Sequence, residues 1–191
     1  MTASTRGARR ERTLEHELKF RLGGPREQAR VRARLRELNA VQESSYDEEN
    51  VRYEAHAKAQ PANLRLRILD GGPGGILTAK GPARFMAGIK SREETELEVP
   101  DAAGMRDLLE TIGFKVSIVY HKHRETWLLA PVTVTIDTLD FGFYSEIEGP
   151  REELAGIAEK LGLEPRHALR MSYSELARRH TNTLAGARRL A

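Results

Sequence analysis

The chain has 191 residues, with 39% hydrophobic residues, 31% charged residues, no cysteine and a formal net charge of +3. This length suits one domain with a real core, while the lack of cysteine excludes disulfides and thiolate metal sites and fits a reducing cytoplasm. Balanced charges argue against a nucleic-acid partner, and no apolar run reaches the ~18 residues of a membrane span, so we expect no membrane partner.

The chain begins with a basic segment and then an alternating one. Residues 1–12, MTASTRGARRER, have no apolar stretch after them, which predicts a disordered lead and not a signal peptide. Residues 14–22, LEHELKFRL, alternate apolar and charged side chains. Because successive residues of a strand point to opposite faces, this segment predicts a strand with one apolar face and one charged face of mixed sign.

The remaining segments divide into helical and strand-like patterns. Helical spacing, caps and stops predict helices over 25–39, 101–113, 150–162 and 172–180. Alternation and turn residues predict strands over 41–54, 64–70, 76–82, 88–100, 115–129, 132–140 and 141–149, with a loop at 54–62. Short connections between the strands favour one antiparallel sheet with flanking helices. We expect one domain over residues 13–178 and a frayed tail over 179–191.

A glycine-rich segment, GGPGG at 71–75, separates two of the predicted strands. Such a segment either cradles a phosphate or forms a turn. A phosphate-binding loop needs a following Lys-Ser/Thr that begins a helix, whereas a strand pattern follows here. The segment therefore predicts a hairpin turn.

The charged strand faces carry both signs, often as i, i+2 pairs. The basic members are Lys19, Arg65, Arg67, Lys80, Lys90, Arg92, Lys122 and Arg124, and the acidic members are Glu15, Glu17, Glu94, Glu96, Glu98, Asp137, Glu146 and Glu148. They belong either to an ordinary solvated face, where such charges matter little, or to the interior of a closed barrel. Converging Arg and Lys in a cavity need an anion such as a polyphosphate. Carboxylates beside that anion need a bridging cation, and oxygen ligands point to Mg²⁺ or Mn²⁺.

Several motifs resemble those of the CYTH family, the triphosphate tunnel metalloenzymes. Residues 15–19, EHELK, match the E-x-E-x-K signature. The other matching segments follow in order: LRLR at 64–67, LTAKGP at 77–82, the strand with Lys90 and Arg92, HKHR at 121–124, IDTLDFGFYSEIEG at 136–149 and SYSEL at 172–176. The resemblance covers roughly residues 13–178.

The resemblance implies an α+β fold, in which an eight-stranded antiparallel β-barrel with flanking helices binds a triphosphate and divalent metal ions. The implied metal carboxylates are Glu15, Glu17, Asp137, Glu146 and Glu148. The implied phosphate-binding residues are Lys19, Arg65, Arg67, Lys80, Lys90, Arg92, Lys122 and Arg124. Glu94, Glu96 and Glu98 receive no firm role, because some of them need only pair with cations of the tunnel.

One segment departs from the family pattern. The family commonly has Asp-x-Tyr followed by an aromatic residue after the first helix, whereas residues 44–48 read SSYDE and keep only Tyr46. In triphosphatase relatives a Lys of the LTxKGP type works with that Tyr to activate water. The resemblance thus implies Lys80 and Tyr46 as catalytic candidates, without deciding between cyclase and triphosphatase.

The sequences of these motifs are most similar to those of class IV adenylate cyclases, which convert ATP to cyclic AMP and pyrophosphate. The alternatives are an inorganic or thiamine triphosphatase and a non-catalytic module that binds polyphosphate or nucleotides. The family also implies a possible homodimer. His121 and His123 flank Lys122 and should point away from the lumen, so they are not expected to bind metal. Met105, Phe114 and Trp127 are expected in the core.

Overall fold

The structure, a computed structural model, describes residues 10–55 and 63–187. Residues 1–9, 56–62 and 188–191 lie outside the described residues, so most of the expected lead, most of the expected loop and the end of the expected tail are not described. Residues 10–12, which were expected to belong to the disordered lead, instead form the start of the first strand. The elements in chain order are β1 (Arg10–Leu22), α1 (Pro25–Glu37), β2 (Val41–Ala55), β3 (Asn63–Leu69), β4 (Gly75–Lys80), β5 (Arg84–Met86), β6 (Ile89–Val99), α2 (Ala102–Thr111), β7 (Phe114–Leu129), β8 (Val132–Leu139), β9 (Gly142–Glu148), α3 (Arg151–Lys160), η1 (Pro165–His167) and α4 (Tyr173–Ala187).

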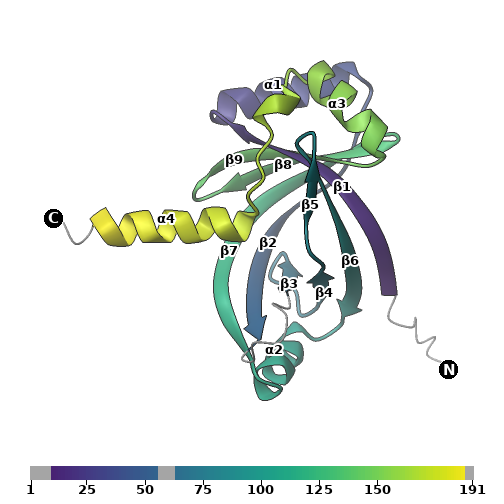
Figure 1. Ribbon diagram of the computed structural model, residues 1–191. Helices are drawn as coiled ribbons and strands as arrows, with labels where there is room; N and C mark the ends of the chain where they lie inside the picture. The colour runs from purple at the N-terminus through teal and green to yellow at the C-terminus, as the bar shows by residue number, and fades with distance from the viewer. Residues whose placement is uncertain (1–9, 56–62, 188–191) are drawn as a thin grey trace.

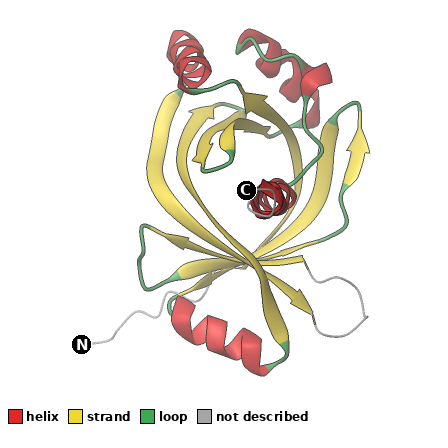
Figure 2. Cartoon of the chain, turned by 90° about the vertical axis from the view of Figure 1, so that its left-hand side faces the viewer, coloured by secondary structure: helices red, strands yellow, loops and turns green. Residues whose placement is uncertain are grey.

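Eight antiparallel strands form a closed barrel. Their order is β1-β9-β8-β7-β2-β3-β4-β6, and pairing of β6 with β1 closes the ring. In Figure 1 the barrel lies between α1 and α3 at the top and α2 at the bottom. Figure 2 looks along α4, which is seen end-on across the opening of the ring of strands. The expected α+β fold, an eight-stranded antiparallel barrel with flanking helices, is confirmed.

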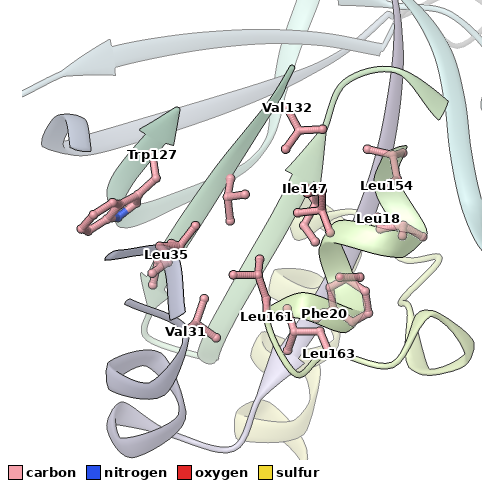
Figure 3. Close-up of a cluster of buried hydrophobic side chains, with 14 of the residues drawn as sticks. Leu18, Phe20, Val31, Leu35, Trp127, Val132, Ile147, Leu154, Leu161 and Leu163 are labelled. Atoms are coloured by element: carbon pink, nitrogen blue, oxygen red, sulfur yellow. The ribbon is translucent and has the colours of Figure 1, made fainter. Parts of the chain in front are cut away.

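The largest hydrophobic cluster lies outside the barrel wall, between the strands and two helices. Leu18 and Phe20 of β1 point outward and are buried against residues of α1 and α3. Figure 3 shows this cluster with Val31 and Leu35 from α1 and residues of α3 and the following segment. Burial of this apolar face on helices leaves the opposite, charged face of each strand for the barrel interior.

Two smaller clusters hold the other helices. Val51, Tyr53 and Leu66 pack against Ala102 and Leu109 of α2. The first turns of α4 pack their aromatic and aliphatic side chains against β7, β8 and β9; the buried members are Tyr120, Leu139, Tyr144, Tyr173, Leu176 and Ala177. Trp127 is buried, and Met105 of α2 and Phe114 at the start of β7 are partly buried in the α2 cluster, so all three are packed as expected.

The predicted turn and helix cap are present. β3 and β4 pair as a hairpin, and Gly71 adopts φ 64°, a left-handed conformation that glycine takes without strain. Gly75 then begins β4, where a Cβ would lie 2.6 Å from the Arg67 carbonyl oxygen. Asp101 caps α2 by accepting a hydrogen bond of 2.9 Å from the Gly104 amide.

Two elements differ from the expectation. The three-residue strand β5 pairs with the start of β6 and was not predicted. Helix α4 continues to Ala187, past residue 178 at which the expected domain ended. Within the described ranges, no helix has both the length and the apolar content that crossing a bilayer requires.

Candidate active site

The barrel interior contains a cavity of about 250 Å³ whose walls are almost entirely charged. The nine basic side chains that line it are Lys19, Arg52, Arg65, Arg67, Lys80, Lys90, Arg92, Lys122 and Arg124. The six acidic ones are Glu15, Glu17, Glu94, Glu96, Glu146 and Glu148. We refer to this space as the charged cavity. Because basic groups outnumber acidic ones in a confined space, its walls favour an anionic ligand.

Strand alternation brings these side chains together. Glu15, Glu17 and Lys19 point inward from β1, while Leu18 and Phe20 between and beyond them are buried outside. The same period of two operates on β3, β6, β7 and β9. All eight phosphate-binding candidates and four of the five metal candidates line the charged cavity.

Most basic side chains of the charged cavity are paired with carboxylates. Lys90 Nζ lies 2.6 Å from Glu17, and Lys19 Nζ lies 3.0 Å from Glu146. Of the nine, eight have such a partner; the other pairs are Arg65 with Glu96, Arg67 with Glu48 and Glu96, Lys80 and Arg92 with Glu94, Lys122 with Glu48 and Asp137, and Arg124 with Asp137 and Glu146. These pairs fix the cationic groups in place before a ligand arrives, which lowers the entropy cost of binding it.

Arg52 is the exception among the described residues, because no carboxylate lies within ion-pair distance of its guanidinium. Burial lowers the pKa of Arg52 to about 10, and the neighbouring Arg65 and Arg92 act in the same direction. A buried cation without a counter-charge is costly. A bound anion is therefore the group that would balance Arg52.

Glu15 and Glu148 are the acidic counterpart, since neither has a basic ion-pair partner among the described residues. Burial raises the pKa of Glu15 to about 8, with added repulsion from Glu148 and Glu94. Burial likewise raises the pKa of Glu148 to about 7, with repulsion from Glu146 and Glu17. A cation between these carboxylates would relieve both effects.

The carboxylates do not form a complete metal cage. In the described part of the chain, no group of three or more acidic or His side chains is arranged to hold a metal ion alone. Mg²⁺ is usually bound by one or two carboxylates together with substrate phosphates and water. Glu15 and Glu148 therefore fit a divalent cation that binds together with a phosphate group.

The first turn of α4 forms part of the charged cavity. Tyr173 and Ser174 line it, together with Ser172, the residue before the helix. The Tyr173 ring lies 4.1 Å from Lys19 Nζ and 5.1 Å from Lys122 Nζ, so it stabilises both ammonium groups by cation–π contacts. Tyr173 thereby holds two candidate phosphate-binding lysines in place.

Asp137 occupies a different place from the other metal candidates. It is 0% exposed and is not among the residues that line the charged cavity. Arg124 Nε donates to its Oδ1 at 2.7 Å, while Arg124 Nη2 and the Tyr173 hydroxyl donate to its Oδ2, each at 2.6 Å. Since both oxygens already accept from protein donors, the structure favours Asp137 as an anchor for Arg124 and Tyr173 and not as a metal ligand.

Lys80 is the basic residue of the charged cavity best suited to accept a proton. Burial, together with the neighbouring Arg65 and against the opposing effect of Glu94, lowers the pKa of Lys80 to about 7. A lysine with a pKa near neutrality has a populated uncharged form and can act as a general base.

The structure does not bring Tyr46 to Lys80. Lys80 pairs with Asn63, whereas Tyr46 lies seven positions before Tyr53, which pairs with Leu64. At ~3.3 Å per residue this offset exceeds about 20 Å along the strands. Tyr46 is also absent from the residues that line the charged cavity. The suggested Lys80–Tyr46 pair is therefore not supported, and only Lys80 remains as a catalytic candidate.

Substitution of Lys80 tests its role as a base. We expect Lys80→Arg, which keeps the positive charge but has no accessible neutral form, to lower kcat by about 100-fold or more. In the wild type, kcat/KM should rise with pH through about 7 and then level off, because only neutral Lys80 accepts a proton. At saturating Mg²⁺, which keeps Glu15 and Glu148 deprotonated, the variant should lose this rise of kcat/KM with pH. Tyr46→Phe and exposed Lys115→Arg should change kcat less than twofold; equal losses in Tyr46→Phe and Lys80→Arg would restore the discarded pair.

Sequence reasoning missed several polar residues of the interior. Arg52 and Tyr120 line the charged cavity. Glu48 is almost fully buried, and although burial opposes it, Lys122 and Arg124 hold the pKa of Glu48 below its ordinary value. Tyr120 lies two residues before Lys122, so the same alternation could have identified it.

The remaining acidic residues and the histidines divide as follows. Glu94 and Glu96 line the charged cavity and pair with its cations, whereas Glu98 is exposed outside it. His121 and His123 lie on the outer face, where they contact Glu49 and Asp47 respectively. The expectation that these histidines point away from the lumen is confirmed.

Comparison with known proteins agrees with this fold and charged interior. The CYTH domain family model matches residues 13–170, and the chain belongs to the CYTH family. A Methanocaldococcus jannaschii protein named "Putative adenylate cyclase MJ0240" is 30% identical over 122 residues, which cover 58% of this chain and 69% of that protein.

Solved structures show the same fold. The PH1012 protein of Pyrococcus horikoshii OT3 is 27% identical, with a TM-score of 0.71 over 85% of this chain and 98% of that one. A Hippeastrum protein, named "Putative adenylyl cyclase HpAC1" and described as revealing a dominant triphosphatase activity, has a TM-score of 0.62 and 19% identity over 78% of this chain and 88% of that one. At that identity the likeness concerns the fold alone.

Proposed function

We propose that this CYTH protein is a divalent-metal-dependent enzyme that acts on a triphosphate inside the charged cavity, with conversion of ATP to cyclic AMP and pyrophosphate as its reaction. The observation that carries the proposal is the charged cavity itself. Its cations outnumber its carboxylates, and Arg52 has no counter-charge among the described residues. The adenylate cyclase name of the archaeal relative supports the choice of reaction.

The residues divide into two sets by chemistry. Arginines such as Arg65 and Arg124 bind phosphate oxygens through paired N–H donors, and lysines such as Lys19 and Lys122 supply point charges. Glu15 and Glu148 would hold Mg²⁺ or Mn²⁺ together with phosphate oxygens. Such a cation neutralises charge that develops on the phosphoryl oxygens.

In the proposed cyclase reaction, the ribose 3′-oxygen forms a bond to the α-phosphorus of ATP. The bond from the α-phosphorus to the α,β-bridging oxygen breaks, and pyrophosphate leaves. Neutral Lys80 accepts the proton of the 3′-hydroxyl group. The surrounding arginines and lysines stabilise the negative charge that moves onto the leaving pyrophosphate, mainly by being positioned in advance.

A triphosphatase reaction is the second candidate. The charged cavity is small and has few uncharged groups, so it could take a bare tripolyphosphate or the phosphates of thiamine triphosphate. Neutral Lys80 would then accept a proton from water, which attacks the terminal phosphorus while orthophosphate is formed.

Product analysis separates the two reactions. The purified protein is incubated with ATP and Mn²⁺, and the products are followed by ³¹P NMR and chromatography. Cyclic AMP and pyrophosphate in equal amounts are expected. ADP with orthophosphate would replace the cyclase assignment by the triphosphatase one, and no turnover of ATP, tripolyphosphate or thiamine triphosphate would contradict both.

A further inference from the structure

A second, larger cavity adjoins the charged cavity on the side of α4. Its volume is about 850 Å³, which falls in the range of sites for organic ligands, whereas the charged cavity is smaller than that range. We call it the outer chamber. The side chains that line both spaces, and so make them continuous, are Arg52, Lys80, Lys90, Arg92, Ser172 and Ser174.

Part of the outer chamber is lined by apolar and neutral polar groups, which are not required for binding phosphate. Pro82, Ala83 and Phe85, from the end of β4 through β5, supply apolar atoms, and Asn63 and Ser117 supply neutral hydrogen-bonding groups. Phe85 is 38% exposed although it is a large aromatic residue, and it belongs to none of the hydrophobic clusters. A partly exposed aromatic ring beside a cavity is available for stacking on a ligand.

Arg170 completes this surface from the segment that precedes α4. Its guanidinium carbon lies 5.6 Å from the centre of the Phe85 ring, and no acidic group of the described residues pairs with it. The guanidinium lies over the ring as a cation–π contact, and both phenyl rings and planar guanidinium groups stack on the bases of nucleic acids. The outer chamber therefore matches a flat heteroaromatic group in shape and chemistry.

Charge decides which heteroaromatic group fits. Six side chains that line the outer chamber are basic and two, Glu54 and Glu175, are acidic. One of these two, Glu54, is paired with Arg178 at 2.6 Å. Excess positive charge disfavours a cationic ring such as the thiazolium of thiamine and tolerates a neutral nucleobase.

We propose that the outer chamber binds the base of a nucleoside triphosphate whose phosphates occupy the charged cavity, with Phe85 and Arg170 determining specificity for it. This inference rests on the proposed function, because it assumes that the charged cavity takes the triphosphate. It goes further by placing the base in the outer chamber and by naming the residues that select it: a nucleotide binds better than bare tripolyphosphate, and the difference depends on Phe85.

Calorimetric titration of Phe85→Ala tests the assignment. Binding of ATP, tripolyphosphate and thiamine triphosphate is measured in EDTA, which prevents metal-dependent turnover. We expect the variant to bind ATP about tenfold more weakly than the wild type does, and tripolyphosphate equally well within twofold. Arg170→Gln should act in the same direction. Met86→Ala is the matched control, because Met86 is the next residue of β5, is 63% exposed and does not line the chamber.

Other outcomes separate this inference from the proposed function. Equal affinity of the wild type for ATP and tripolyphosphate, or equal losses for both ligands in Phe85→Ala, would overturn it. An equal loss for thiamine triphosphate and ATP would overturn the selection for a neutral base. Turnover is assayed separately with Mg²⁺: the expected binding pattern without any turnover contradicts the proposed enzyme and leaves the nucleotide chamber in place.

Discussion

Glu15→Gln is expected to lower metal-dependent turnover of the triphosphate substrate by about 100-fold or more, a loss typical of removing a group that stabilises transition-state charge. Glu15 lies in the charged cavity without a basic ion-pair partner among the described residues, so its carboxylate is available for a cation. The amide keeps the size of the side chain but removes its charge. Steady-state assays over a range of Mg²⁺ concentrations measure the loss, which should include a higher metal requirement.

The same variant should remain folded. Because Glu148 and Glu94 repel the Glu15 carboxylate in the metal-free protein, its replacement should leave the thermal midpoint in EDTA unchanged or slightly raised. Glu98→Gln is the matched control, since Glu98 is exposed and lies outside the charged cavity. Turnover by Glu15→Gln at the wild-type rate would remove Glu15 from the site. A protein that binds triphosphates but never turns them over would instead be the non-catalytic module.

Asp137→Asn is expected to destabilise the protein itself. Breaking a buried, hydrogen-bonded ion pair costs about 3–5 kcal/mol, and for a chain of this length the thermal midpoint should fall by roughly 10 °C. The reason is that Arg124 and Lys122 lose the charge they face in a fully buried place, and Tyr173 loses its anionic acceptor. Thermal and urea unfolding are measured in EDTA.

Asp140→Asn is the control, because Asp140 is exposed at the turn after β8. The metal-free condition separates an anchor from a metal ligand. If Asp137 served to bind metal, its neutralisation would relieve repulsion in the metal-free protein and leave the midpoint unchanged or higher. A change below about 2 °C would therefore contradict the anchoring role, since it corresponds to under ~1 kcal/mol.

The two faces of the strands could be predicted because one simple pattern repeats along them, whereas the closed eight-stranded barrel was implied by the resemblance to the CYTH family. In β1 the alternation of Glu15, Glu17 and Lys19 with Leu18 and Phe20 is enough to assign both faces of the strand. β5 could not be predicted, because three residues are too few to show a period of two. The length of α4 was underestimated, since its polar second half has no strong apolar stripe in the sequence.

The sequence predicted most of the residues that line the charged cavity, but not which of them lie close to one another. Strand register decides that Tyr46 and Lys80 lie far apart, and a single sequence does not report register. Asp137 pairs in register with Arg124, which lines the charged cavity, yet Arg124 and Tyr173 take both of its oxygens. Arg52 was missed although Val51 and Tyr53 alternate with Asn50, Arg52 and Glu54, so the same period of two could have identified it.

The most direct test of the central claim, a triphosphate held with a divalent cation in the charged cavity, is a crystal structure with Mn²⁺ and a non-hydrolysable triphosphate analogue. We predict an anomalous manganese peak between Glu15, Glu148 and the phosphate oxygens, with the phosphates surrounded by the lysines and arginines of the cavity and in contact with Arg52. Phosphates bound outside the barrel, or a metal bound away from both carboxylates, would contradict this claim.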